Sequence, residues 1–323
     1  MKRIILLLLT SILIVSCGDN QKPISNAESK DTVVKHQVQT TKVPDYQADY
    51  FYVVDENSDI FVGNSPDDLQ ITEVNGFDAV ISPNGKYLVY TALIANRRSI
   101  YIYHIDSKSS NLLNLPPDNE AYMGSFSPDS CYIAANFFTN NYHWNIALYD
   151  LKKDTFKLIG KEKNCDYFSP TFSPDCKYLV FHDMEKLYVY DFKGFASKFN
   201  KTIACENFCT QNDMGISSNN KFQIMSGEQY IVFTYDYFSQ ERLETTVLAY
   251  YDVETGEITE LSNKKTNTCL DFALSHDGLI YFLLSNNDNP DEAQLYVAKT
   301  DGQKPAKVSS HIFQTPCSFS IAN

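Results

Sequence analysis

Hydrophobic and polar residues alternate with a period of two over most of the chain from Tyr46 onward, in short runs separated by turn residues. Leu187–Tyr190 and Leu295–Val297 are two such runs. This alternation places successive side chains on opposite faces of a β-strand. The pattern therefore predicts many short strands and an all-β fold that begins near residue 46.

A turn motif recurs along this region. Its copies start at Ser82, Ser127, Ser173, Ser226 and Ser275, at intervals of 45, 46, 53 and 49 residues. The first copy reads Ser-Pro-Asn-Gly-Lys, and the third has Asp in place of Asn. Proline presets φ at the second turn position, Asp or Asn bonds to nearby backbone, and Gly adopts the left-handed conformation. Each copy therefore predicts a tight turn between two strands.

A second alternating stretch, a second turn and a last short strand follow each motif, as in Glu254–Gly256 and then Glu257–Leu261. Each unit is thus predicted to be a four-stranded antiparallel meander of about 46 residues, which is the size of a propeller blade.

The two ends of the repeat array complete each other. Residues 48–75 contain three predicted strands but no preceding turn motif, and Thr315–Ser320 imitates Ser169–Ser173 near the C-terminus. Pairing the last strand with the first blade would hide two exposed sheet edges. The predicted fold is a six-bladed β-propeller of four-stranded antiparallel blades, closed by pairing of the C-terminal strand with the N-terminal blade. The alternative, a stack of β-sandwiches, does not explain the even spacing or the split blade.

These turns resemble those of the TolB-like six-bladed β-propellers, whose blades carry a Ser-Pro-Asp-Gly-Lys turn. The resemblance covers residues 46–323 and implies the fold, whereas the turn itself is structural and says little about function. The sequence departs from the pattern at Ser130 and Cys176, which stand at or near the glycine position, and in the weak copy at Ser226.

The N-terminus has the pattern of a lipoprotein signal peptide. Lys2 and Arg3 precede an apolar run from Ile4 to Val15, which is shorter than the roughly 20 residues of a membrane-spanning helix. Residues 14–17, Ile-Val-Ser-Cys, resemble the bacterial lipobox, in which the cysteine receives a diacylglycerol. We expect a signal peptide at 1–16 and lipidation of Cys17; the alternative is an ordinary secretory signal with a chance cysteine.

Residues 17–45 are polar and contain almost no aromatic side chains, so we expect a flexible tether there and a propeller domain over 46–323. Gly18 rather than Asp follows Cys17. By analogy with sorting in proteobacteria, this favours the outer membrane, with the domain facing the periplasm or the cell surface.

The net charge of −13 argues against a nucleic-acid partner and against membrane contact beyond the lipid. Seven cysteines remain besides Cys17, with Cys205 and Cys209 as the one close pair. Whether any of them form disulfides stays open. No zinc pattern is present, and we expect no metal and no cofactor.

Variable loops between the second and third strands, and between blades, are predicted to share one face of the propeller. Loops on a rigid scaffold often carry binding residues, and aromatic and Arg side chains often anchor interfaces. The alternative is that these aromatic rings fold back over the blades. The candidate binding residues are Arg97, Arg98, Tyr142, His143, Trp144, Tyr235, Tyr237 and Phe238.

No catalytic residues are predicted. The six histidines are scattered, and the chain has neither an H-E-x-x-H motif nor a G-x-S-x-G elbow. The favoured function is a monomeric, non-enzymatic envelope module that binds a protein, peptide or glycan. The alternative is a polysaccharide lyase or hydrolase with its site at the mouth of the central channel.

Overall fold

The computed structural model describes residues 51–116, 119–160 and 164–322. These residues belong to a compact unit that extends from 42 to 323, apart from a separate unit at 1–41. The predicted signal peptide, Cys17 and the predicted tether at 17–45 lie outside the described residues. Within the described ranges, no helix is long and apolar enough to cross a membrane.

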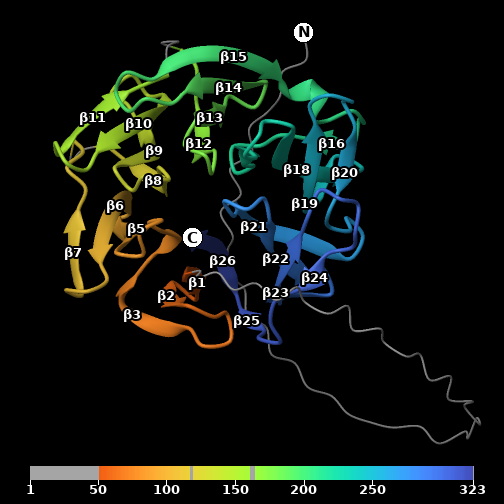
Figure 1. Ribbon diagram of the computed structural model, residues 1–323, viewed down its shortest axis with the longest axis horizontal. Helices are drawn as coiled ribbons and strands as arrows, with labels where there is room; N and C mark the ends of the chain where they lie inside the picture. Colours follow the sequence, from red (N-terminus) through yellow and green to blue (C-terminus); the bar gives the residue numbers. More distant parts are fainter. Residues whose placement is uncertain (1–50, 117–118, 161–163, 323) are drawn as a thin grey trace, which may run out of the picture. The chain divides into compact units, whose positions relative to one another are not determined.

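Six antiparallel sheets are arranged in a ring, and one edge of each sheet faces its centre (Figure 1). From the channel outward, blade 1 contains β26 (Pro316–Ala322), β1 (Phe51–Glu56), β2 (Asp59–Gly63) and β3 (Gln70–Asn75). Blade 2 contains β4 (Phe77–Ile81), β5 (Tyr87–Ile94), β6 (Arg97–His104) and β7 (Ser109–Leu112). Blade 3 contains β8 (Ala121–Phe126), β9 (Tyr132–Phe138), β10 (Trp144–Asp150) and β11 (Thr155–Leu158).

The other three blades follow in chain order around the ring. Blade 4 contains β12 (Phe168–Phe172), β13 (Tyr178–His182), β14 (Lys186–Asp191) and β15 (Lys198–Ala204), followed by the short helix η1 (Cys205–Asn207). In blade 5, β16 (Met214–Gly215) and β17 (Phe222–Ile224) both pair with β18 (Tyr230–Ser239), which is followed by β19 (Arg242–Asp252) and β20 (Ile258–Glu260). Blade 6 contains β21 (Asn267–Leu274), β22 (Ile280–Asn286), β23 (Asn289–Ala298), β24 (Ala306–Lys307) and β25 (Phe313–Gln314).

The recurring turn owes its sequence to one set of hydrogen bonds. In blade 2, the Ser82 hydroxyl accepts a bond from the Tyr87 amide at 2.9 Å and donates to Asn84 Oδ1 at 2.8 Å. Gly85 follows with φ = 69°, in the left-handed region that glycine adopts at little cost. Ser130 and Cys176 adopt the same conformation, with φ = 56° and 59°. The structure thus keeps the turn geometry where the sequence departs from glycine.

Closure of the ring by the C-terminal strand is confirmed. β26 pairs with β1 in antiparallel register, with Val53 opposite Ser320 and Val54 opposite Phe319. The side chain of Phe319 is 1% exposed and packs in the core cluster shared by blades 6 and 1. The predicted six-bladed architecture is therefore correct, including its split first blade.

Polar side chains also link neighbouring blades around the channel. The Thr91 hydroxyl of blade 2 accepts a hydrogen bond from the Met123 amide of blade 3 at 3.2 Å. Asn136 Oδ1 of blade 3 accepts one from the Ser169 amide of blade 4 at 3.1 Å. These bonds satisfy backbone amides where the inner strands depart from regular pairing. They hold the beginnings of the inner strands in fixed positions around the channel.

Candidate functional site

A cavity of about 890 Å³ lies in the channel and is lined by inner-strand residues of all six blades. Each inner strand begins at the face that carries the turns between the second and third strands, which we call the loop face. The opposite face carries the Ser-Pro turns, and Pro83, Pro128 and His276 line the cavity near them. The cavity therefore connects the predicted binding face with the interior of the ring.

In four of the six blades, an equivalent position of the inner strand lines this cavity beside a bulge. Asp78, Met123 and Ser169 each lie four residues before the turn serine, each has φ = 53°, and each falls where the register of its inner strand shifts. Asp271 occupies the same position before Ser275, again beside a register shift. Because a bulge re-aims a side chain, these four residues line the cavity at equivalent points of their blades.

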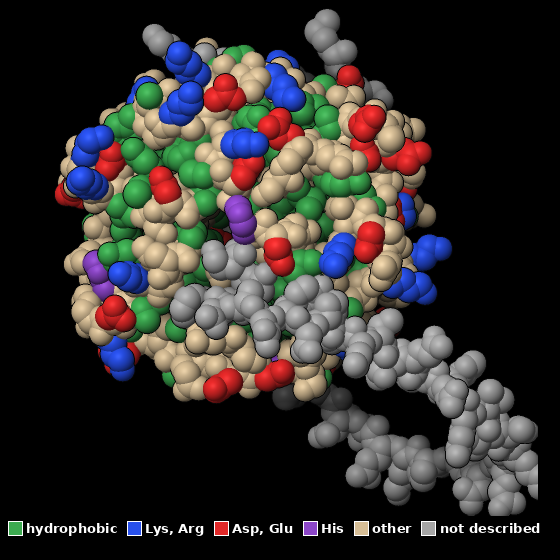
Figure 2. Space-filling model, viewed as in Figure 1, with side chains coloured by type: hydrophobic (Ala, Val, Ile, Leu, Met, Phe, Trp, Pro, Cys, Tyr) green, Lys and Arg blue, Asp and Glu red, His purple; other side chains and the backbone are tan. Residues whose placement is uncertain are grey.

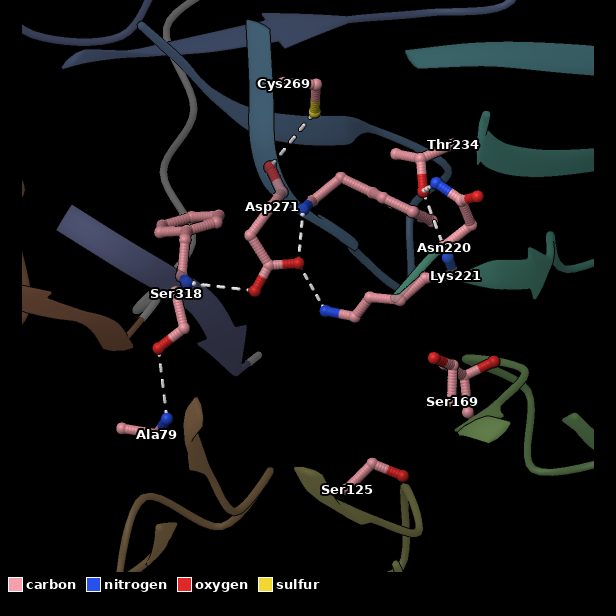
Figure 3. A network of polar contacts seen from close by, with 12 residues as sticks. Ala79, Ser125, Ser169, Asn220, Lys221, Thr234, Cys269, Asp271 and Ser318 are labelled. Atoms are coloured by element: carbon pink, nitrogen blue, oxygen red, sulfur yellow. Dashed lines mark hydrogen bonds and ion pairs between the residues drawn. The ribbon is translucent and has the colours of Figure 1, made fainter. Parts of the chain in front are cut away.

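Asp271 forms an ion pair with Lys221 across the boundary between blades 6 and 5. Its carboxylate also accepts hydrogen bonds from the backbone amides of Phe272 at 2.7 Å and Phe319 at 3.0 Å. Figure 3 shows Asp271 between Lys221 and the end of the chain near Ser318. The carboxylate is thus held by three donors and joins blades 5, 6 and 1.

Asp78 lies within electrostatic reach of this pair, and among the described residues it forms no ion pair. Its pKa is raised from 3.8 to about 6, chiefly by burial and also by the negative charges of Asp271 and Asp55, while Lys221 and a hydrogen bond from Thr91 act in the opposite direction. The Thr91 hydroxyl donates to Asp78 Oδ2 at 3.4 Å. The cavity therefore contains one carboxylate held by three donors, Asp271, and another whose pKa is raised to about 6, Asp78.

Arg98 forms the centre of an aromatic cluster at the end of the cavity that opens on the loop face. Its guanidinium lies 4.2 Å from the ring centroid of Tyr122 and 5.0 Å from that of Trp144, and Nε donates to Glu120 at 2.9 Å. The Trp144 ring packs against Tyr122 and Phe138, both at 4.9 Å between centroids. We call Arg98, Tyr122, Phe138 and Trp144 the Arg98 cluster. It brings together two predicted residues, Arg98 and Trp144, and supplies cation–π contacts at a partly exposed site.

The predicted residues next to Trp144 lie in the turn between β9 and β10. Tyr142 is 83% exposed, and its ring contacts that of Phe138 at 6.4 Å. His143 Nδ1 lies 3.3 Å from Asp166 Oδ1, and the same carboxylate oxygen accepts the Trp144 amide at 2.7 Å. Asp166 thus fixes the base of the turn, while Tyr142 projects from it.

The other predicted residues are not brought into the Arg98 cluster. Tyr235 does not reach the surface: its ring is fully buried in the core of blade 5 and its hydroxyl donates to Glu260 at 2.6 Å, so it leaves the candidate set. Tyr237 is half-buried beneath Lys264, whose Nζ lies 4.8 Å from the ring centroid, and Phe238 is half-buried next to it. Arg97 is exposed at the start of β6.

Exposed apolar side chains gather at the loop face of four blades. They lie in or next to the turns between second and third strands, and we call them the apolar tips: Leu93 (64% exposed), Ile94 (50%), Tyr142 (83%), Met184 (41%) and Leu243 (51%). Large apolar groups at successive turn tips mark an interaction surface more clearly than single scattered ones.

Charged side chains do not form a single patch on the face that Figure 2 shows. In the view of Figure 2, acidic and basic side chains are scattered among hydrophobic and neutral ones, without a broad area of one sign on that face. Six cysteines of the described part are free thiols: Cys131, Cys165, Cys176, Cys205, Cys209 and Cys269. Among the described residues, no group of three His, Cys, Asp or Glu side chains could hold a metal ion.

Sequence reasoning missed Asp78, Lys221 and Asp271. A usable signal existed, because Asp78 and Asp271 stand four residues before a turn serine. In blade 5 the turn position is occupied by Met225 and not by Ser226, because the Met225 amide donates to the Tyr230 carbonyl at 3.0 Å. Lys221 lies four residues before Met225, so counting from Ser226 does not identify it.

Comparison with known proteins yields matches only among solved structures: no family model matches the sequence, and no curated protein does. TolB from Acinetobacter baumannii is similar with a TM-score of 0.59 and 15% identity, over 84% of this chain and 66% of TolB. A putative TolB from Agrobacterium tumefaciens is similar with a TM-score of 0.53 and 13% identity, over 82% of this chain and 91% of that one.

An oligogalacturonate lyase in complex with manganese is also similar, with a TM-score of 0.50 and 15% identity, over 78% of this chain and 71% of the lyase. At such identities these likenesses show the fold alone. The predicted TolB-like six-bladed propeller is thereby confirmed as the architecture of the described residues.

Proposed function

We propose that this TolB-like propeller is a non-enzymatic, monomeric binding module of the bacterial cell envelope that engages a protein partner on its loop face. The observation that carries the proposal is the placement of the apolar tips around the same end of the cavity as the Arg98 cluster. Aromatic and Arg side chains surrounded by apolar contacts form the energetic centre of many protein interfaces. A rigid disc with TolB-like architecture is a suitable scaffold for such a surface.

Site-specific photo-crosslinking in the native host tests this proposal. A p-benzoylphenylalanine placed at Tyr142 is expected to give a discrete adduct with a protein, because this exposed ring stands within the proposed interface. The matched control carries the same probe at Ile71, which is 59% exposed on the outer strand β3. Equal labelling from both positions, or adducts with glycan alone, would contradict a protein partner on the loop face.

We further propose that the propeller is held at the outer membrane by a lipid on Cys17, a residue outside the described part of the chain. Each buried methylene contributes about 0.8 kcal/mol, so a multiply acylated N-terminus does not readily leave the bilayer. Cys17→Ser is expected to abolish incorporation of a labelled fatty acid and to move the protein to the soluble fraction. Retention of the label by the variant would refute lipidation at this residue.

Asp78 is the observation that favours the alternative function, an enzyme acting on polysaccharide. A carboxyl with a pKa of about 6, next to the fixed carboxylate of Asp271, suits proton transfer near neutral pH. One assay distinguishes the two functions. The protein is incubated with acidic and neutral polysaccharides, and new reducing ends and unsaturated products are measured. Our proposal predicts no product, and product formation that Asp78→Asn abolishes would select the enzyme.

A further inference from the structure

Sulfur-containing side chains line a second pocket, which shares no lining residue with the central cavity. Its volume is about 500 Å³, and Met184, Cys205 and Cys209 form part of its wall. Glu185, Lys186 and Glu206 line the remainder together with two apolar side chains. The pocket belongs to blade 4 and to the segment that leads from it to blade 5.

Backbone hydrogen bonds tie together the two segments that bring these three residues to the pocket. The Cys205 amide at the start of η1 donates to the carbonyl of Glu185, in the turn between β13 and β14, at 2.7 Å. Lys186 pairs with Ala204 at the adjoining ends of β14 and β15. Met184 lies in that turn with φ = 72°, and its amide donates to His182 Nδ1 at 3.1 Å. The turn between β13 and β14 is therefore connected directly to η1, and the two segments form the wall of one pocket.

Both thiols are neutral in the empty pocket. Cys205 is 4% exposed, and Cys209 is half-buried against the same core. The pKa of each thiol is raised to about 12, chiefly by burial, with a further contribution from the charge of Asp183 for Cys205 and of Asp236 for Cys209. Thiols and thioethers are poor ligands for hard cations, which prefer oxygen. They suit a soft cation, which can displace the thiol protons.

We propose that this pocket binds Cu(I) through Sγ of Cys205, Sγ of Cys209 and Sδ of Met184. On binding, each thiol releases one proton to solvent and forms one Cu–S bond, and the metal keeps its oxidation state. The two thiolates and the monovalent metal leave one net negative charge, and the pocket wall adds the positive charge of Lys186 and the negative charges of Glu185 and Glu206. Affinity is expected to rise with pH, because binding releases protons.

Anaerobic titration of the full mature chain with Cu(I) held by bathocuproine disulfonate tests this site, with loss of the coloured complex as the readout. We expect one Cu(I) per chain. Cys209→Ser should weaken binding by about tenfold or more, and Met184→Leu should weaken it less, because a thioether is the weaker donor. Cys131→Ser is the matched control, since that thiol is exposed in the Ser-Pro turn of blade 3 and should be dispensable.

Circular dichroism melting confirms that each variant is folded. Met184→Leu conserves volume and keeps the test decisive even where Cys209→Ser destabilises the chain. Unchanged Cu(I) binding in Cys209→Ser and Met184→Leu would overturn the proposal. Preferential binding of Zn(II) in a competition, or a Cys205–Cys209 disulfide in the protein isolated from the host envelope, would overturn it as well.

Discussion

Ending the chain after Thr315 is expected to prevent the propeller from folding. The deletion removes β26, the inner strand of blade 1, and leaves the edge of β1 unpaired. It also removes the Ser318 and Ser320 hydroxyls, which accept hydrogen bonds from the Ala79 and Ile81 amides of blade 2 at 3.1 and 3.0 Å. The lost burial and pairing exceed the 5–15 kcal/mol by which folded domains are typically stable. Soluble yield and far-ultraviolet circular dichroism measure the result.

A single substitution in β26 tests the same strand with a smaller expected loss of stability. Phe319→Ala should lower the free energy of unfolding by about 3–5 kcal/mol, the usual cost of emptying a buried phenylalanine site. The matched control is Phe199→Ala on the outer strand β15, whose side chain is 39% exposed and which should lose much less. Equal losses in the two variants by denaturant titration, or a truncated chain with an unchanged midpoint, would contradict closure by β26.

Asp78→Asn is expected to stabilise the protein at neutral pH. The pKa of Asp78 is raised from 3.8 to about 6, so the folded state holds its proton more tightly than the unfolded chain does. The charged carboxylate therefore costs stability as the pH rises from 3.8 toward 6, and the cost reaches about 3 kcal/mol at neutral pH. Asparagine removes that charge and keeps an oxygen that can accept the bond from Thr91.

The stability gain from Asp78→Asn is expected to depend on pH. The difference in unfolding free energy between Asp78→Asn and the parent should be small at pH 4, grow as the pH rises from about 4 to 6, and be nearly constant above pH 7. Subtracting the parent removes the contribution of other groups, such as buried His182, whose pKa burial lowers to about 4. Asp106→Asn, an exposed control in blade 2, should show no such trend. A stability difference between Asp78→Asn and the parent that does not change with pH would contradict the raised pKa of Asp78.

The architecture was predictable because the same turn motif, stabilised by local hydrogen bonds, recurs along the sequence. The serine hydroxyl at the start of each Ser-Pro turn bonds to backbone five or fewer residues away, so the motif survives in sequence whatever surrounds it. The split first blade was readable for a related reason: an unpaired first unit needs a strand that only the other terminus supplies.

The cavity residues were not predictable in the same way, because their roles depend on contacts between blades. Lys221 and Asp271 are 50 residues apart in sequence and meet only when the ring forms. Tyr235 shows the converse problem, since an aromatic residue in an apparent loop turned out to lie in the long strand β18 with its ring in the core. Arg98 and Trp144 were identified by residue type, but their stacking on Tyr122 required the fold.

The most direct test of the binding face compares two adjacent arginines in the crosslinking experiment at Tyr142. Arg98→Ala removes the centre of the Arg98 cluster, whereas Arg97→Ala removes an exposed neighbour of equal charge. We expect Arg98→Ala to weaken partner capture by about 30-fold, corresponding to a hot spot of about 2 kcal/mol, and Arg97→Ala to change it by less than about twofold. Capture that falls equally in both variants, or in neither, would contradict the claim that this end of the channel is where the propeller binds its partner.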